Sequence, residues 1–412
     1  MNPLLLLLLA VLSYRLLLIS DPFSLPLPPT KSWIIRIRAL FTFSSTYAKF
    51  SLRSRLFLIF RGLVYLTFTP VWIFLWTLDD IIFSNYKEVE IINPVFLVGG
   101  FRTGSTSLHR ALSLDEERYV SPRFVELAMP FLCLHYFLDF LEMIDSKTGT
   151  TFILKIEKKF QQVLGEECMA RHPMSFYEAE EDDILHAAWH LTGWYIGTMF
   201  PDGEAWIESG QMVESYSVEE QDKMFKFYER SLQKVLYRRG KGRCLLSKSH
   251  LIEFMFILER KIPTATFVGT VRNPKDTFVS WYALAQAASY VMGGKWALPV
   301  ESAARAHLRF WDLFAGAEMK FFGEGVEDKK KKTLVSFKDY IKDQEKTVRR
   351  IYKNMGVEIS EDFERALKDD AERHANYKAK RGYDNPDLEK DLGVKAKDVE
   401  DRMKEYIKKF KL

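Results

Sequence analysis

The chain has 412 residues, enough for one large α/β domain with appendages, and its formal net charge of +4 does not imply a nucleic-acid partner. Its three cysteines, Cys133, Cys168 and Cys244, are odd in number and far apart, and no Cys-x-x-Cys or Cys/His finger spacing occurs. The cysteines therefore favour neither a disulfide framework nor a structural zinc site. The 32 Phe, 18 Tyr and 9 Trp favour a large apolar core, a membrane surface or an apolar substrate site.

The first 83 residues are apolar and basic, which predicts a membrane-associated region. Residues 1–20 are rich in leucine and fit either a signal peptide or a membrane helix. No acidic residue occurs from Pro22 to Leu78, and residues 56–78 carry one charge, Arg61. This stretch is long enough to cross a bilayer. A spanning helix would place the rest of the chain in a lumen, such as that of the Golgi or another endomembrane. Alternatively, the helices lie on the membrane or pack on the domain.

A strand, a glycine-containing turn and the start of a helix are predicted between Pro94 and Leu112. The apolar residues Val95–Val98 favour a strand, and the apolar spacing after Ser107 favours a helix. Between them lies a loop, residues 99–107, with the sequence GGFRTGSTS. Such a turn directs backbone N–H groups to one point at the positive end of the helix dipole. The loop is therefore predicted to bind an oxyanion, most simply a phosphate, although glycine turns also join strands to helices without binding a ligand.

The spacing of this loop is close to that of a nucleotide-binding P-loop, with one difference. Gly99, Gly104 and Thr106 fit the pattern G-x-x-x-x-G-K-[ST], but Ser105 stands where the lysine should be. That lysine holds the β- and γ-phosphates in NTPases, whereas the only cation in this loop is Arg102. The loop is expected to hold a phosphate without hydrolysing ATP.

A second strand–loop–helix unit is predicted from Lys248 to Leu284. Thr266–Val271 favours a strand, Arg272 follows its end, and a helix begins near Asp276. Strands that alternate with helices predict an α/β fold, a P-loop-like arrangement of three layers with a central parallel sheet flanked by helices. Because ligands bind at the carboxyl ends of such strands, Arg102 and Arg272 are expected to face the same crevice.

The two units resemble the sulfotransferases that use 3′-phosphoadenosine 5′-phosphosulfate. PVFLVGGFRTGSTSLHRALSLD is similar to the family's 5′-phosphosulfate loop, and ATFVGTVRNPKDTFVSWYAL is similar to its 3′-phosphate element. Phe101 stands where the family has proline. The resemblance covers residues 78–410, is specific in the two loops, and points to the membrane-associated branch of the family. It implies a catalytic domain over residues 84–412 that follows a membrane-associated region over residues 1–83.

The resemblance also implies roles for the residues of the two loops. Arg102 would contact the 5′-phosphosulfate, while Arg272 and Ser280 would bind the 3′-phosphate. Backbone N–H and hydroxyl donors would come from Thr103, Gly104, Ser105, Thr106 and Ser107. Sulfuryl transfer is an in-line displacement that uses positioned cations and N–H donors. The implied co-substrate is therefore 3′-phosphoadenosine 5′-phosphosulfate, and no metal ion is expected.

Two further residues match positions that the membrane-associated and tyrosyl-protein branches use in catalysis. Glu126 lies where these relatives carry a glutamate downstream of the loop, and it would act as the general base toward the acceptor. It is the single acid in the apolar stretch Phe124–Leu134, which predicts a raised pKa. The alternative is an interfacial acid paired with Arg123. Lys248 matches a lysine that these relatives place near the leaving group.

A run of acidic residues stands apart from these motifs. Glu180–Asp183, followed by His186 and His190, is interpreted as a solvated start of a helix with half-buried histidines. A metal site and a part of the acceptor pocket together with His172 are the alternatives. Lys380–Gly382 resembles a basic loop that closes on the 3′-phosphate in cytosolic relatives.

The sequence leaves three functions open. The favoured one is transfer of a sulfuryl group to a hydroxyl or amine of a small-molecule, lipid or glycan acceptor at a membrane. It is favoured by the apolar N-terminal region and by the aromatic stretch 124–140. The alternatives are an atypical P-loop nucleotide or nucleoside kinase and a non-catalytic membrane scaffold with a degenerate nucleotide site. No nucleic-acid partner is expected, and the sequence predicts no particular oligomeric state.

Overall fold

A computed structural model of the chain describes residues 13, 27–41, 52–190, 213, 215–293, 300–323, 331–377 and 384–412. The leucine-rich segment 1–20, apart from residue 13, and the loop Lys380–Gly382 lie outside these residues.

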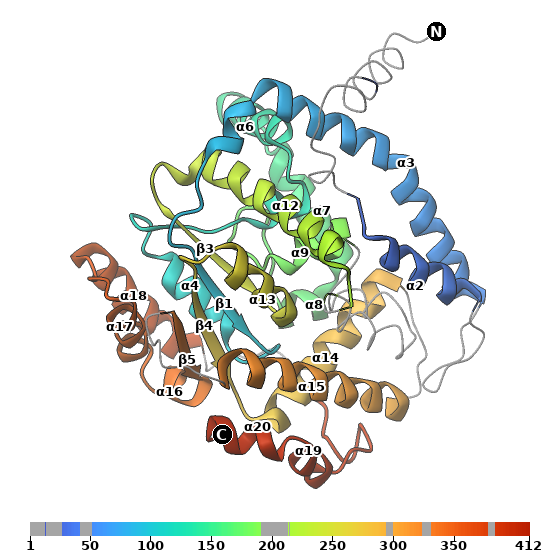
Figure 1. The fold of residues 1–412 in the computed structure, drawn as a ribbon, viewed down its shortest axis with the longest axis vertical. Helices are drawn as coiled ribbons and strands as arrows, with labels where there is room; N and C mark the ends of the chain where they lie inside the picture. The colour runs from blue at the N-terminus through green and yellow to red at the C-terminus, as the bar shows by residue number, and fades with distance from the viewer. Residues whose placement is uncertain are drawn as a thin grey trace.

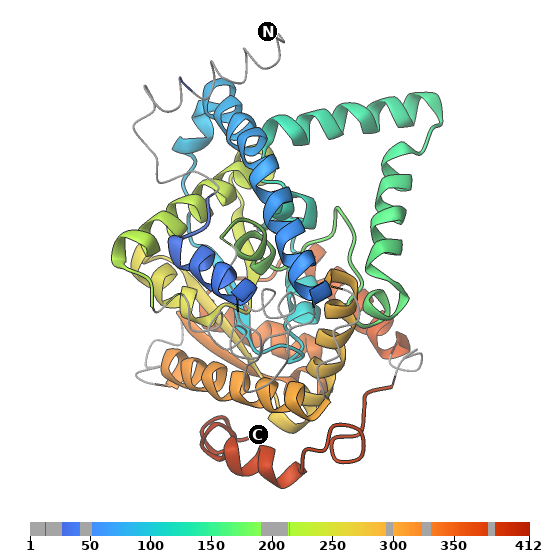
Figure 2. The same cartoon turned by 90° about the vertical axis from the view of Figure 1, so that its right-hand side faces the viewer.

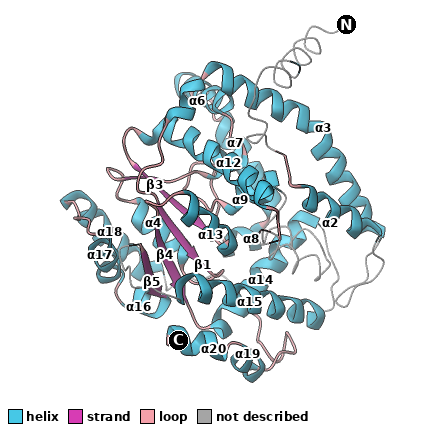
Figure 3. Ribbon diagram, viewed as in Figure 1, coloured by secondary structure: helices cyan, strands magenta, loops and turns pink. Residues whose placement is uncertain are grey.

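The described chain alternates strands with helices (Figure 3). The strands are β1 (Val95–Gly99), β2 (Tyr119–Val120), β3 (Cys244–Ser249), β4 (Thr266–Val271) and β5 (Lys332–Ser336). The helices before β3 are α2 (Thr30–Phe41), α3 (Leu52–Ile82), η2 (Ser84–Glu88), α4 (Ser105–Ser113), α5 (Phe124–Ala128), α6 (Leu132–Thr148), α7 (Phe152–Leu164), α8 (Glu166–Arg171), α9 (Asp183–Leu185), η3 (His186–His190), α12 (Val218–Val235) and η4 (Leu236–Gly240). Those after β3 are α13 (Ile252–Lys261), α14 (Pro274–Gly293), α15 (Val300–Gly323), α16 (Phe337–Lys342), α17 (Gln344–Met355), α18 (Glu361–Tyr377), α19 (Ala396–Arg402) and α20 (Lys404–Phe410).

The five strands form one parallel sheet in the order β2-β3-β1-β4-β5 (Figure 1). β1 lies in the middle, where Val95 pairs with Leu246 of β3 on one side and with Thr266 of β4 on the other. All five residues of β1 are buried, as expected for a parallel strand that is covered on both faces. The central parallel sheet predicted from the alternating pattern is confirmed.

Alternate residues of β1 face two separate hydrophobic cores. Phe96 and Val98 belong to the larger core, and Val95 and Leu97 belong to the smaller one, because successive side chains of a strand point to opposite faces. The larger core includes Phe227 of α12, Phe254 of α13 and Phe310 of α15. The smaller core includes Leu108 of α4, Val348 of α17 and Phe363 of α18. Helices therefore cover both faces of the sheet, which gives the predicted three layers.

The last turns of α3 pack into this domain. Trp76 is fully buried and stacks on Phe227, with 5.0 Å between the ring centres. Asp79 accepts the backbone N–H groups of Leu132 and Cys133 at the start of α6, at 2.7 and 2.8 Å, and forms an ion pair with Lys234. A carboxylate at a helix N-terminus satisfies N–H groups that have no acceptor within the helix. The end of α3 is thus fixed to the domain core, and the functional division at residue 83 stays a prediction.

Large apolar side chains remain exposed on the rest of α3 and on α2. Figure 2 shows α3 crossing the front of the molecule in blue, with the green helices α6 and α7 projecting beside it. Phe60 of α3 and Phe41 of α2 are 61% and 73% exposed. The segment Gly62–Ile82, with 21 residues and a mean hydropathy of 1.3, could cross a membrane by length and composition alone, criteria that core helices and signal sequences also meet.

Candidate active site

The loop after β1 turns sharply into α4, and two of its residues have a positive φ. These are Gly104, at +89°, and Arg102, at +63°. A Cβ at Gly99 would come within 2.2 Å of the Thr270 hydroxyl oxygen, so only glycine fits this approach to β4. The turn brings the first N–H groups of α4, which have no acceptor within the helix, to the carboxyl end of β1. The predicted strand, turn and helix are therefore present.

The guanidinium of Arg102 connects this loop to the second strand–loop–helix unit. Its Nε donates to the hydroxyl of Ser280 on α14 at 2.8 Å, and its Nη1 donates to the carbonyl of Arg171 at 3.0 Å. Nη1 of Arg272 donates to the carbonyl of Arg102 at 3.1 Å. The Arg272 guanidinium also lies 4.2 Å from the centre of the Phe337 ring. Arg102, Arg272 and Ser280 therefore lie together at the carboxyl ends of β1 and β4, and their ligand-binding roles stay predictions.

The hydroxyl groups of the loop have different partners. The buried hydroxyl of Thr103 lies 2.6 Å from the carbonyl of Gly100 and 2.7 Å from the hydroxyl of Thr270. That of Ser107 lies 3.0 Å from the hydroxyl of Tyr340. The Thr103 side chain therefore fixes the turn against β4. Its hydroxyl is engaged there, so the donor that this residue offers to a ligand is its backbone N–H group.

Lys248 supplies the cation that the loop lacks at position 105. It lies on β3, where it pairs with Leu97 of β1, and its side chain is fully buried. Its Nζ donates to the hydroxyl of Thr106 at 2.8 Å and forms an ion pair with Glu181. A lysine thus reaches the loop from the neighbouring strand instead of from the loop itself.

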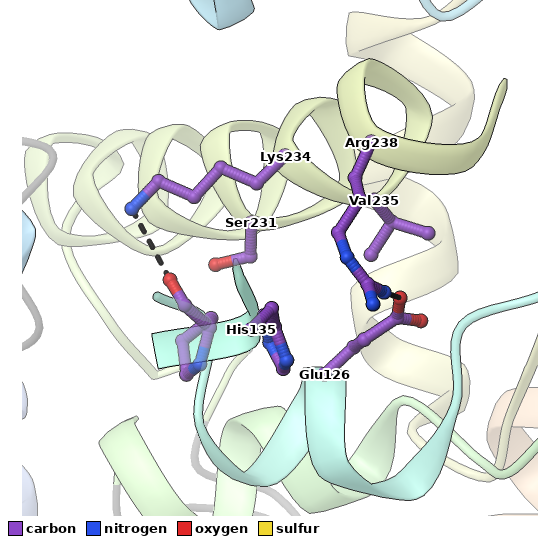
Figure 4. A pocket seen from close by; sticks show the side chains of 7 residues that line it. Glu126, His135, Ser231, Lys234, Val235 and Arg238 are labelled. Carbon is purple, nitrogen blue, oxygen red and sulfur yellow. Dashed lines mark hydrogen bonds and ion pairs between the residues drawn. The ribbon is translucent and has the colours of Figure 1, made fainter. Parts of the chain in front are cut away.

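Glu126 lies in a different polar cluster (Figure 4). Its carboxylate forms ion pairs with Arg239 at 2.6 Å and Arg238 at 3.1 Å, both on η4, and accepts the backbone N–H of Arg123 at 2.9 Å. Glu126 and Arg238, with His135 and Lys234, line a small pocket. Burial acts to raise the pKa of Glu126, but the Arg239 pairing outweighs it and lowers the pKa. The expected raised pKa is wrong, and so is pairing with the Arg123 guanidinium, which lies over the Tyr177 ring.

The acidic run is buried, which contradicts the solvated interpretation. The residues Glu180, Glu181, Asp182 and Asp183 are all buried, with at most 3% of each residue exposed. Asp182 accepts hydrogen bonds from the hydroxyls of Tyr228 and Ser247 at 2.5 and 2.9 Å, and burial raises its pKa to about 6. Asp183 accepts the backbone N–H of His250 at 2.7 Å. The run therefore packs against the end of β3 and not against solvent.

His186 and His190 do not form a metal site with this run. Their Nδ1 atoms lie 3.0 Å apart, and both rings are buried among aromatic side chains. Burial lowers the pKa of His190 to about 3. Among the described residues, three ligand atoms come within 4.8 Å of one another at His172, Glu180 and Glu181 instead. Nε2 of His172 lies 3.3 Å from Glu180 and 3.9 Å from Glu181.

The sequence placed Glu181 in the acidic run, with His172 as a possible neighbour in an acceptor pocket, but did not predict its pairing with Lys248. Glu181 is 67 residues before Lys248, and its acidic neighbours made a solvated face the simplest interpretation. One signal was present, because the acidic run directly precedes the apolar and aromatic residues Ile184–Trp189. A helix that is apolar on nearly all sides is buried, so the acidic residues at its start are expected to be buried with it.

Comparison with known proteins agrees with this architecture. Residues 94–361 match the model of the Sulfotransferase family. The chain is 25% identical over 287 residues to omega-hydroxy-beta-dihydromenaquinone-9 sulfotransferase Stf3 of Mycobacterium bovis and Mycobacterium tuberculosis, an alignment that covers 69% of this chain and 68% of the relative.

Two solved structures share the fold. Sulfotransferase STF1 from Mycobacterium tuberculosis H37Rv has a TM-score of 0.63 at 17% identity, and the alignment covers 97% of this chain and 98% of that one. Sulfotransferase STF9 from Mycobacterium avium has a TM-score of 0.64 at 13% identity, with 98% and 95% covered. The family model spans well over half of the 412 residues. This chain therefore belongs to the sulfotransferase family.

Proposed function

We propose that this protein transfers the sulfuryl group of 3′-phosphoadenosine 5′-phosphosulfate to a hydroxyl group of a lipid acceptor at a membrane. One observation carries the choice of donor. Arg102, Arg272 and Ser280 form one connected set across the ends of β1 and β4, and this set suits a ligand with two separated phosphate groups. The 5′-phosphosulfate would lie on the loop Thr103–Ser107 and Arg102, and the 3′-phosphate would lie at Arg272 and Ser280.

The cations around the loop suit the chemistry of sulfuryl transfer. In an in-line displacement, negative charge builds on the oxygen that joins the sulfuryl group to the leaving phosphate. Fixed cations and N–H donors stabilise that charge when they are already in place. Lys248 is held at the loop by Thr106 and by Glu181, so its ammonium needs little rearrangement. Lys248 and Arg102 are therefore proposed to stabilise the transition state.

A lipid acceptor is supported by two observations. The relatives of known activity named above act on a menaquinone with a hydroxyl group. In addition, large apolar side chains are exposed on α2, α3, α6 and α7. Helices with exposed apolar side chains of this kind can lie in the headgroup region of a membrane. The Golgi location considered from the sequence receives no support from these relatives, so the proposal is limited to membrane association.

The donor is tested by isothermal titration with 3′-phosphoadenosine 5′-phosphate, the product of the transfer reaction. We expect wild-type protein to bind it and Arg272→Ala to weaken binding by about 2–4 kcal/mol, the scale of charge-assisted hydrogen bonds in a site. Arg365→Ala is the matched control, because Arg365 is exposed on α18 and pairs only with Asp362 among the ion pairs described. Absence of binding by the wild type, or equal binding by Arg272→Ala, would overturn the assignment.

The acceptor is tested by supplying labelled donor with farnesol, dodecanol, cholesterol or octyl glucoside in detergent. We expect sulfated product from an apolar alcohol and little from the glucoside. Sulfated product from the glucoside alone would contradict a lipid acceptor and indicate a glycan acceptor instead. Donor binding without product from any alcohol would favour a non-catalytic scaffold.

A further inference from the structure

The acidic run beside Lys248, Glu180–Asp183, contains a buried carboxylate with a hydrogen-bond partner for only one of its two oxygens. Glu180 is 1% exposed, and its Oε1 accepts the backbone N–H of Glu181 at 3.3 Å. Its Oε2 has no hydrogen-bond partner among the described residues. A buried polar oxygen without a hydrogen-bond partner costs free energy. A hydrogen-bond donor on a bound ligand would offset that cost.

Two separate contacts place this carboxylate beside the loop. Glu181, the next residue in the chain, binds Lys248, which in turn donates to Thr106. On the other side, Nε2 of His172 lies 3.3 Å from Oε1 of Glu180, and the preceding residue, Arg171, accepts a hydrogen bond from Arg102 through its carbonyl. Glu180 and His172 therefore approach each other without a hydrogen bond, and each is next in the chain to a residue that contacts one of the two cations that we assign to the phosphosulfate.

Each of the other carboxylates nearby already has at least one partner. Burial acts to raise the pKa of Glu181, but Lys248 outweighs it and lowers the pKa, so this carboxylate serves to hold the lysine. Asp182 and Asp183 accept hydrogen bonds from Tyr228 and from the backbone of His250. Within the described cluster, Oε2 of Glu180 and Oδ1 of Asp182 are the carboxylate oxygens without a hydrogen-bond partner. Of these two residues, Glu180 is the one that lies beside a partly exposed side chain, that of His172, which is 14% accessible.

From this arrangement we infer that Glu180 accepts the proton of the acceptor hydroxyl and that His172 positions Glu180. The inference rests on the proposed sulfuryl transfer. The hydroxyl would donate to Oε2 while Nε2–H of His172 faces Oε1. As the acceptor oxygen attacks sulfur, the new O–S bond forms and the bond from sulfur to the 5′-phosphate oxygen breaks. The proton passes to Oε2, and 3′-phosphoadenosine 5′-phosphate leaves with the electron pair of the broken bond. Glu180 then releases the proton to solvent.

The first experiment compares Glu180→Gln with Glu178→Gln in the sulfuryl-transfer assay with farnesol and dodecanol. Glu178 is the matched control, because its side chain is 55% exposed and pairs with Arg110 at the surface. We expect Glu180→Gln to lower kcat about 10²–10⁴-fold, the range for loss of a general base, and Glu178→Gln to leave it unchanged. Titration with 3′-phosphoadenosine 5′-phosphate should give the same Kd, within about twofold, for both variants and the wild type, because neither change removes a donor-binding group.

The second experiment tests the positioning role of His172. His172→Ala should lower kcat about tenfold, as expected for a misplaced base, without changing the Kd for 3′-phosphoadenosine 5′-phosphate. His172→Gln keeps an N–H donor near Oε1 and should recover part of that loss. A purely structural role would instead lower the folded fraction and donor binding in both variants alike.

Several results would overturn the inference and leave the proposed function intact. One is a Glu180→Gln variant that transfers sulfuryl at the wild-type rate. Another is loss of transfer in Glu126→Gln with donor binding and folding retained, which would make Glu126 the base. A third is loss of wild-type activity on dialysis against EDTA with recovery on adding a divalent cation, which would make His172, Glu180 and Glu181 a metal centre. Failure of the wild type to bind the product or to transfer to any probe would overturn the proposed function as well.

Discussion

Glu126 and Glu181 are both buried carboxylates whose pKa is lowered by basic partners, yet they lie in different parts of the molecule. Glu126 faces Arg238 and Arg239 on η4, and these contacts fix α5 against the end of α12 and η4. Glu181 faces Lys248, which also reaches the phosphate loop. Both carboxylates are therefore buried and paired with a cation. The two sites differ in what else that cation contacts.

The comparison shows why a perturbed carboxylate does not by itself mark an active site. Ion pairs that only hold a fold together shift a pKa as strongly as catalytic ones. Glu181 is connected to the phosphate loop by a chain of contacts, because it pairs with Lys248 and Lys248 donates to Thr106 at the N-terminus of α4.

The largest effect is expected for Lys248→Met. Loss of a fixed cation beside the loop should lower kcat about 10³-fold, comparable to loss of an oxyanion-stabilising group. The measurement is initial-rate sulfuryl transfer, with Lys346→Met as the control, because Lys346 is exposed on α17. Activity within tenfold of the wild type would remove Lys248 from the catalytic set.

A double variant separates the catalytic effect from the stability effect. Lys248→Met alone leaves Glu181 as a buried charge without its partner, which destabilises a fold. Lys248→Met combined with Glu181→Gln removes that charge, so thermal stability should recover while kcat stays low. Recovery of kcat in the double variant would mean that the lysine acts through the fold alone.

A smaller effect is expected for Glu126→Gln, and mainly on stability. Neutralising this carboxylate leaves Arg238 and Arg239 facing an amide, which should lower the free energy of unfolding by about 2 kcal/mol. Because the pKa of Glu126 is lowered in the folded state, its contribution is present above the unfolded pKa and is lost as the pH falls through the folded value. Unfolding in urea from about pH 6 down to about pH 2 should therefore show a weaker loss of stability in the variant than in the wild type. An equal loss would contradict the assigned pairing.

These two carboxylates also mark the limit of what the sequence could predict. The loop after β1 and the strand before Arg272 are local patterns, since glycines, apolar runs and helix starts follow one another within a few residues. The partners of Glu126 are 112 and 113 residues away, and the partner of Glu181 is 67 residues away. Local pattern gives no information on such pairs, because the sheet order β3-β1-β4 decides which side chains meet. For the same reason Lys248 was placed from the resemblance, while its contact with Thr106 was visible only in the structure.

The smallest effect is expected at the apolar surface. Phe137 and Phe140 on α6 are 53% and 51% exposed, so replacing both with serine removes apolar area without opening the core. Because α2 and α3 keep their own exposed apolar side chains, binding to phosphatidylcholine–phosphatidylglycerol vesicles should fall only about tenfold, less than full burial of two phenylalanines would give. Ile341→Ser on α16 is the matched control, since Ile341 is 44% exposed and α16 lies far from α6 in Figure 1. Equal vesicle binding by both variants would exclude α6 from the membrane-facing surface and leave α2 and α3 to form it.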